Sequence, residues 1–364
     1  MIKRFEQFGG ENTELHYYAL DWDDNILHMP TKILMDEKVG ESWKPIDVST
    51  AEFAKLRQDT ENYRLRNGDP VVAFSEFRDT GSRGDISFLQ DVQIAISQNS
   101  LAPSWDSFIK CLSEGALFAI ITARGHEPSS IRRGVEYIID TILPKIPSQN
   151  PGYSVADEMF QQLKKFKYIF GTDHSGDLQL KGQPSQNKLV KSYLDSCSFF
   201  GVSSPSFAKQ FGEGSASNPE KAKEMALDYF VERCNEFGSR IGAKAVSVGF
   251  SDDDPKNVEH VEKFFKEKLP SIGSSVKLSL YKTTDPTIKG GEVMKFTETS
   301  HQTPGLESSV LPFTKWNNMT QRLYPSTKDA PTDDYHNQLI NQVSQAKDLY
   351  KKFAFKRKKN KLKK

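Results

Sequence analysis

The sequence of 364 residues has few cysteines and no long hydrophobic run, and both absences narrow what the protein can be. Its three cysteines (Cys111, Cys197 and Cys234) are far apart and odd in number, which fits neither a disulfide framework nor a zinc site. No stretch approaches 18 consecutive apolar residues, so we expect no membrane span. The N-terminal residues lack the apolar core of a secretory signal. A cytoplasmic protein in reducing surroundings is expected.

The charge is unevenly distributed along the chain. Residues 351–364 contain nine Lys or Arg and no acid, although the whole chain has a formal net charge of only +1. Removing those nine from the 49 basic residues leaves 40 against 48 acidic residues, so the first 350 residues have a net charge of −8. A basic tail on an acidic body has three interpretations: it binds nucleic acid through phosphates, it binds an acidic protein, or it only aids solubility.

Five short apolar runs without clean polar alternation are typical of strands buried in a parallel sheet: 16–22, 117–122, 198–203, 244–250 and 276–281. Helical patterns lie between most of them, at 103–114, 128–142, 219–236 and 255–268. Asn218 is the expected cap of the third helix, which opens on Pro219. Strands that alternate with helices predict an α/β fold with a parallel sheet flanked by helices on both faces.

The domain prediction follows from where this alternation stops. Residues 1–15 form an N-terminal arm, and residues 16–285 form one domain with insertions at about 29–102 and 144–196. The first insertion contains a predicted hairpin, and loops of this length commonly act as lids or caps. Residues 286–364 form a polar C-terminal extension, extended or disordered up to about 334, with one helix predicted over 334–356.

Polar residues follow three of the predicted strands. The first strand ends in Asp21-Trp22-Asp23-Asp24, the second in Thr122, and the fourth in Asp252-Asp253-Asp254. The carboxyl ends of parallel strands meet at one edge of a sheet, where ligands bind. Carboxylates crowded there repel one another unless a cation neutralises them, and hard oxygen ligands without His or Cys favour Mg²⁺. We expect Asp254 to cap the following helix, which starts at Pro255.

Together these segments resemble the four motifs of the haloacid dehalogenase superfamily. The motifs occur in the family's order: Asp21-x-Asp23 after a strand, Thr122 after another, a lysine opening a later helix, and Asp252-Asp253-x-x-x-Asn257. The matched region spans roughly residues 16–285. The resemblance implies a Rossmann-like domain with inserted flap and cap segments, and a phosphatase that requires Mg²⁺.

The resemblance also implies a role for each matched residue. Asp21 would be the nucleophile that forms an aspartyl-phosphate, and Asp23 would be the general acid and base. Thr122 would bind the transferring phosphoryl group. A lysine would offset the negative charge, and we prefer Lys221 to Lys223 because it lies nearer the positive end of its helix.

The metal would be held by Asp21, by Asp252 and Asp253, and by the backbone carbonyl of Asp23. Arg124 and Asn25 are predicted to contact the substrate, Arg124 through a phosphate or carboxylate. Asn25 departs from the family, which usually has Thr or Val at that position.

The sequence therefore predicts a Mg²⁺-dependent phosphomonoesterase whose phosphorylated substrate could be a nucleotide or a nucleic-acid end. The alternative is a non-enzymatic structural or interaction protein that retains the same scaffold, which the long C-terminal extension favours. The start IKRFEQF is also similar to the leaders of some head proteins of contractile-tailed phages, which would imply virion association. The intact pair Asp21 and Asp23 favours the enzyme.

Overall fold

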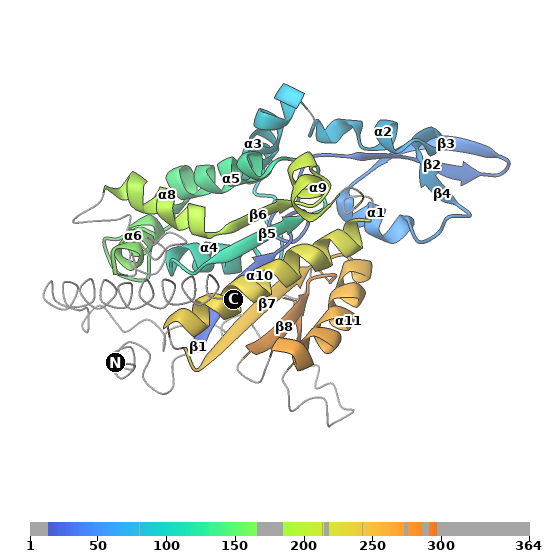
Figure 1. Cartoon of the computed structure of the whole chain (residues 1–364). Coiled ribbons are helices and arrows are strands. Elements are labelled where there is room, and N and C mark those ends of the chain that lie inside the picture. The colour runs from blue at the N-terminus through green and yellow to red at the C-terminus, as the bar shows by residue number, and fades with distance from the viewer. Residues whose placement is uncertain are drawn as a thin grey trace, which may run out of the picture.

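A six-stranded sheet is the centre of the fold (Figure 1). The computed structural model describes residues 14–79, 81–165, 185–212, 214, 218–241, 243–272, 276–285 and 291–296. The sheet order is β6-β5-β1-β7-β8-β9, and all pairings are parallel except β8 with β9. The strands are β1 (Glu14–Leu20), β5 (Phe118–Thr122), β6 (Ser198–Gly201), β7 (Ala245–Asp252), β8 (Val276–Lys282) and β9 (Glu292–Phe296).

The five predicted parallel strands are confirmed, and the predicted α/β class with them. Residues 292–296, in a segment predicted to be extended or disordered, form β9, an antiparallel edge strand on β8. The predicted helix at 334–356, the basic tail at 351–364 and residues 1–13 of the N-terminal arm lie outside the described residues.

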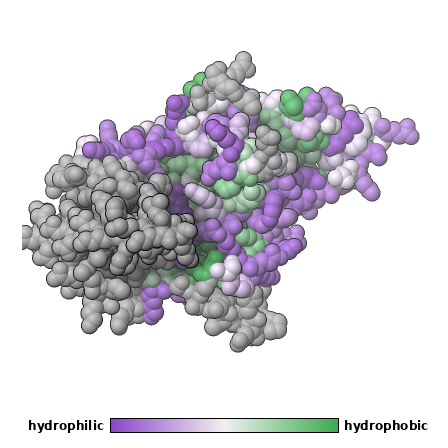
Figure 2. Space-filling view, in the orientation of Figure 1, coloured by the Kyte–Doolittle hydropathy of each residue, from purple (hydrophilic) through white to green (hydrophobic). Residues whose placement is uncertain are grey.

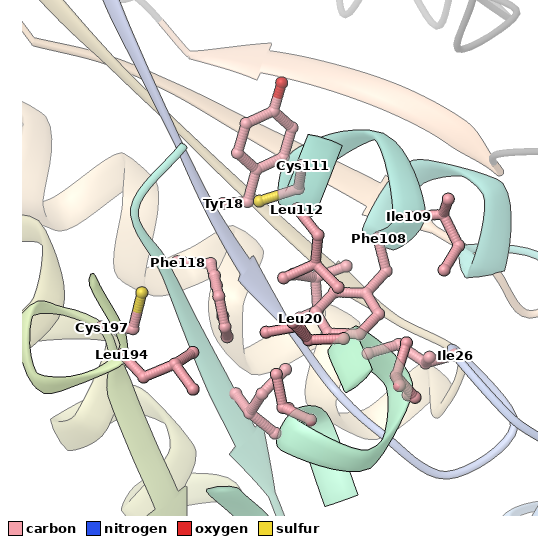
Figure 3. Packing of buried hydrophobic residues seen from close by; sticks show 14 of the residues in the cluster. Tyr18, Leu20, Ile26, Phe108, Ile109, Cys111, Leu112, Phe118, Leu194 and Cys197 are labelled. Atoms are coloured by element: carbon pink, nitrogen blue, oxygen red, sulfur yellow. The ribbon is translucent and has the colours of Figure 1, made fainter. Parts of the chain in front are cut away.

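Both faces of the sheet are buried because successive side chains of each strand point in opposite directions. On one face, Tyr18 and Leu20 of β1 and Phe118 of β5 join a large hydrophobic cluster. Figure 3 shows Leu20 and Phe118 pointing into this cluster beside Phe108, whose ring centroid lies 5.6 Å from that of Phe118. On the other face, Tyr17 and Ala19 of β1 join a second cluster. The continuous apolar runs of the sequence reflect this two-sided burial.

Helices cover each face of the sheet. α10 and α11 supply the second cluster, and α4, α5, α6 and α8 supply the first. Asn218 caps α10 as predicted, since its Oδ1 accepts a hydrogen bond from Lys221 N at 2.9 Å. The bounds are α3 (Gly81–Ser97), α4 (Trp105–Ser113), α5 (Pro128–Tyr137), α6 (Val155–Lys165), α8 (Gln186–Ser196), α9 (Pro205–Phe211), α10 (Pro219–Ile241) and α11 (Pro255–Ile272), with η4 (Ile138–Ile142) and η5 (Leu143–Lys145) after α5.

The first insertion forms a small antiparallel sheet that projects from the main body (Figure 1). The predicted hairpin is confirmed as β2 (Ile33–Val39) and β3 (Ser42–Val48), and β4 (Tyr63–Leu65) pairs with β2. Its projecting tip is mostly hydrophilic (Figure 2). Four short elements complete the unit: α1 (Thr50–Leu56), η2 (Arg66–Gly68), α2 (Pro70–Ala73) and η3 (Ser75–Phe77). A separate apolar cluster, which includes Ile33, Met35, Val48 and Phe77, holds it together. That this unit is the family's flap stays a prediction.

The second insertion, 144–196, contributes to the main core where it is described. Met159 and Leu163 of α6 and Leu189 and Tyr193 of α8 are fully buried in the first cluster. These two helices therefore cover the sheet rather than form a separate cap, while residues 166–184 lie outside the described residues. The described helices include none that is long and apolar enough to cross a membrane. The three cysteines are buried free thiols.

Gly201, at the end of β6, packs against the loop that follows β5. A Cβ at this position would lie 2.1 Å from the carbonyl oxygen of His126 and 2.9 Å from that of Arg124. We expect Gly201→Ala to displace this loop and to lower the free energy of unfolding by about 2 kcal/mol. Denaturant unfolding measures this change, with Ser206→Ala on the exposed face of α9 as the control. Equal stability of the two variants would contradict the predicted close approach.

Candidate functional site

The ends of β1 and β7 place the predicted carboxylates side by side. The parallel register pairs Leu20 with Ser251, and Asp21 N donates a hydrogen bond to Ser251 O at 2.9 Å. Asp21 and Asp252 therefore leave neighbouring strands at the same level. One carboxylate oxygen from each of Asp21, Asp252 and Asp253 lies within 4.8 Å of the others. The sequence prediction that these three acids converge is confirmed.

Burial and mutual repulsion make this group of acids unfavourable in the ionised form. Burial raises the pKa of Asp21 well above its ordinary value, and the charges of Asp252 and Asp23 raise it further. Burial likewise raises the pKa of Asp253, and its neighbours Asp252 and Asp21 add to the shift. A bound cation would reverse both effects, since it stabilises the carboxylate form. The three acids together could hold a metal ion.

Lys223 is the only basic side chain among these acids in the part of the chain that the structure describes. Its Nζ lies 2.7 Å from Asp252 Oδ2 and 3.1 Å from Asp21 Oδ1, and its side chain is only 2% exposed. Burial alone would lower the pKa of Lys223, but Asp21 and Asp252 outweigh this effect and raise it. Lys223 is therefore a buried ammonium ion that partly neutralises the carboxylates.

The preference for Lys221 as the site lysine was wrong. The Lys221 side chain is 57% exposed and pairs with Glu224 on the outer face of α10. Nearness to the helix terminus does not decide the direction of a side chain; the helical phase does. Residues 223, 227, 230, 231 and 234 recur at the spacing of one helix face, and the last four are the buried Leu227, Phe230, Val231 and Cys234. That apolar pattern was the signal in the sequence for Lys223.

Asp252 is held in a fixed orientation by the start of α11. Its Oδ1 accepts hydrogen bonds from Asp254 N at 3.0 Å and from Asn257 Nδ2 at 3.1 Å. Asp254 caps the helix as predicted, since its Oδ1 accepts a hydrogen bond from Lys256 N at 2.9 Å. Asp253, between them, is left to face the pocket.

Asn25 has a structural role that corrects its predicted contact with substrate. Its side chain is fully buried, and its Nδ2 donates to Asp21 O at 2.9 Å and to Ser251 Oγ at 2.8 Å. Its Oδ1 accepts hydrogen bonds from the hydroxyls of Ser104 and Thr283, both at 2.8 Å. Asn25 thus fixes the turn that follows Asp21 and does not line the pocket.

Asp23 and Arg124 form a buried ion pair. Arg124 Nη2 lies 2.7 Å from Asp23 Oδ1, and Arg124 Nε lies 2.8 Å from Asp23 Oδ2. Thr122 donates a longer hydrogen bond of 3.3 Å from Oγ1 to Asp23 Oδ2. The predicted neighbours Asp23 and Thr122 are therefore in contact. The Asp23 carboxylate does not belong to the group of three acids, and the contact of its backbone carbonyl with a metal stays a prediction.

The prediction that Arg124 contacts the substrate is revised by these contacts. Besides Asp23, its guanidinium donates to Thr31 Oγ1 at 3.0 Å and lies 3.7 Å from Asp91. The rings of Phe77 and Phe88 lie 4.7 and 5.6 Å from it. Arg124 reaches the pocket but is committed mainly to positioning Asp23, through partners in the first insertion.

A pocket of about 350 Å³ opens over the strand ends and joins them to the first insertion. Its walls combine residues that the sequence predicted with residues that it did not. The sequence analysis did not predict that aromatic and apolar residues of the insertion line the pocket. Their only signal in the sequence was their apolar character within a polar segment. The lining includes Asp21, Asp23, Thr122, Arg124, Lys223 and Asp253 from the sheet edge, and Ile33, Phe53, Ala54, Arg57, Phe74 and Phe77 from the insertion.

The two lysines of α10 provide a matched test of the charge balance. We expect Lys223→Met to lower the free energy of unfolding by about 3–5 kcal/mol, because it leaves buried carboxylates without their counter-ion. Lys221→Met should change it by no more than about 0.5 kcal/mol. Denaturant unfolding in the absence of divalent metal makes the comparison.

The same pair of variants has a predicted pH dependence. The raised pKa values of Asp21 and Asp253 mean that the folded state retains protons that the unfolded chain has released. Stability from these groups therefore falls as the pH rises above their unfolded pKa values. The deficit of Lys223→Met should be larger at pH 8 than at pH 5. Equal effects of the two substitutions, or a deficit that grows toward acid pH, would contradict this charge balance.

Substitution of one member of the Asp23–Arg124 pair should lower the free energy of unfolding more than substitution of both members. Arg124→Met leaves Asp23 buried without its guanidinium, and we expect a loss of about 3–5 kcal/mol in the free energy of unfolding. The double variant Asp23→Asn/Arg124→Met should regain a measurable part of that loss. Thermal and denaturant unfolding report the difference. A double variant no more stable than the single one would indicate that the two side chains do not interact.

Comparisons of the chain with protein-family models, curated proteins and solved structures find no match. The geometry establishes a pocket at the carboxyl edge of a parallel sheet. Three acids converge there beside the buried Lys223, and Arg124 holds the carboxylate of Asp23 in place.

Proposed function

We propose that this protein is a Mg²⁺-dependent phosphomonoesterase of the haloacid dehalogenase type. The observation on which the proposal rests is the position of Asp21. Its carboxylate lies beside Lys223, Asp252 and Asp253 and lines the same pocket as Asp23 and Thr122. Asp21 Oδ1 is buried, and Lys223 Nζ lies 3.1 Å away as its ion-pair partner. The Asp21 carboxylate also lines the pocket, where it would meet a metal or an electrophile.

Asp21, Asp252 and Asp253 would hold the metal. When bound, Mg²⁺ supplies positive charge that neutralises these carboxylates and polarises the phosphate oxygens. The residues fit this ion because their oxygens converge, and because a cation would offset the burial and the mutual repulsion that raise the pKa values of Asp21 and Asp253. Lys223 supplies one positive charge against three acids, so a divalent ion would complete the neutralisation.

The chain's own residues account for the chemistry in two steps. Asp23 is an ion-paired carboxylate in the free protein, so it must take up a proton before the first step. In that step an Asp21 oxygen attacks phosphorus, and the bond from phosphorus to the alcohol oxygen breaks as the protonated Asp23 gives its proton to that oxygen. In the second, water attacks phosphorus, Asp23 takes a proton from the water, and the bond from phosphorus to Asp21 breaks. Phosphate leaves, and both carboxyl groups return to their initial state.

Three other groups position or stabilise these reactants. Thr122 Oγ1, whose contact with Asp23 is long at 3.3 Å, can turn to donate to a phosphoryl oxygen. Lys223 offsets the charge that gathers around Asp21. Arg124 holds both oxygens of Asp23 and so fixes the direction from which it exchanges protons.

The alternative of a non-enzymatic interaction protein was based on the C-terminal extension, most of which lies outside the described residues. The same holds for nucleic acid or an acidic protein as a partner of the basic tail. No contact within the described ranges favours either partner, so the enzyme is the function that we propose.

The proposal predicts Mg²⁺-dependent hydrolysis of p-nitrophenyl phosphate that requires Asp21. We expect Asp21→Asn to lower the rate by at least about 10³-fold, because the amide cannot act as the nucleophile. Release of p-nitrophenol with Mg²⁺, and with EDTA in its place, measures the effect. The control is Asp47→Asn, whose side chain is 59% exposed on the small sheet. Full turnover by Asp21→Asn would show that the nucleophile is wrongly assigned.

A further inference from the structure

The pocket has a second half that phosphate chemistry alone does not require. In addition to the acids of the sheet edge, its lining includes Ile33, Phe53, Ala54, Phe74 and Phe77 of the first insertion. The rings form a connected series, with centroids 5.7 Å apart between Phe53 and Phe74 and 5.8 Å apart between Phe74 and Phe77. Phe77 is buried, whereas Phe53 and Phe74 are only partly buried and border the open space.

The series of rings starts near Asp23, which would donate a proton to the leaving oxygen of the substrate. Phe77 stacks on the Arg124 guanidinium at 4.7 Å, and Arg124 holds Asp23. In the proposed reaction Asp23 exchanges a proton with the alcohol oxygen of the substrate. The organic part attached to that oxygen therefore extends from Asp23 toward Phe77 and Phe74, while the phosphate faces Asp21 and Lys223.

Most polar residues in this half of the pocket form ion pairs or hydrogen bonds with other residues of the protein. Arg57 pairs with Glu220 at 3.0 Å and with Asp254 at 2.6 Å, which joins α1 to the starts of α10 and α11. Asp79 Oδ2 accepts a hydrogen bond from Gly125 N at 3.1 Å, and Thr50 donates to Asp24. The surfaces left to contact an organic group are therefore the aromatic rings and their apolar neighbours.

From this arrangement we propose that the substrate is a small phosphate monoester whose alcohol portion contains a flat aromatic ring, such as an aryl phosphate or a mononucleotide. The inference rests on the proposed function and specifies its substrate class. Aromatic rings attract a further ring in offset or edge-to-face geometry. A sugar phosphate without a base offers these Phe and Ile side chains only hydroxyls, which lose water there without gaining partners, whereas a mononucleotide also presents its flat base. A volume of about 350 Å³ suits one small molecule rather than a polymer.

The test compares phosphate release from four substrates in the presence of Mg²⁺: a nucleoside monophosphate, glucose 6-phosphate, acetyl phosphate, and an oligonucleotide with a 5′-phosphate. We expect kcat/KM for the mononucleotide to exceed that for glucose 6-phosphate by at least about tenfold. Equal efficiency on both, or a preference for the oligonucleotide, would overturn the inference and leave the phosphatase proposal intact. Release from none of the four would count against the phosphatase itself.

The variant that isolates the ring is Phe74→Leu, which retains apolar volume and so limits damage to the small core. We expect its KM for the mononucleotide to rise roughly tenfold with little change in kcat, and its kinetics with acetyl phosphate to stay the same. Val71→Ala, in the same segment with Val71 79% exposed, is the matched control. A uniform loss on both substrates would indicate a structural role for Phe74 and would contradict the inference.

Binding of phosphonates, which the protein cannot hydrolyse, tests the same inference if none of the substrates is turned over. Benzylphosphonate and methylphosphonate have the same anionic group and differ in the ring. Calorimetry on the wild-type protein with Mg²⁺ should show tighter binding of benzylphosphonate, and Phe74→Leu should remove most of the difference. Equal binding of the two phosphonates would overturn the ring-specific pocket.

Discussion

The repulsion among Asp21, Asp252 and Asp253 is the constraint on which the rest of the site depends. The parallel register of β1 and β7 forces the first two together, and burial removes the water that would screen them. One buried ammonium, from Lys223, offsets part of this charge. Such an arrangement destabilises the fold unless it is neutralised, and strained or costly groups of this kind cluster at functional sites. The apolar packing of α10 against the sheet brings Lys223 to the strand ends.

The turn after β1 shows how the fold keeps this unfavourable geometry in place. Asn25 connects four segments, since its amide donates to Asp21 and Ser251 and accepts from Ser104 and Thr283. Only a side chain with two donors and a double acceptor can satisfy all four partners. A Thr or Val at this position could not. Asn25 therefore contributes to the rigidity of the turn after Asp21 rather than to contact with a substrate.

Much of the fold could be predicted because strands buried on both faces give continuous apolar runs and helix starts give recognisable capping residues. The five parallel strands, the caps Asn218 and Asp254, and the convergence of three acids all follow from local patterns. The differences concern the direction of one side chain, which the helical phase of α10 could have indicated, and contacts between segments that are distant in the sequence. Lys221 and Lys223 lie about 200° apart around the helix, and the packed face selects Lys223. β9 depends on a partner strand, and the aromatic half of the pocket depends on how a separate insertion folds back.

The first insertion does more than enclose the pocket, because it also positions a residue of the sheet edge. Thr31 and Asp91, from segments on either side of the small sheet, both contact Arg124, and Phe77 stacks on it. Arg124 in turn holds Asp23. The residues that would contact the organic part of a substrate are thus mechanically connected to the carboxylate that would exchange protons with it. In such an arrangement the fit of the organic group and the orientation of Asp23 cannot vary independently, so substrate selection and chemistry depend on the same packing.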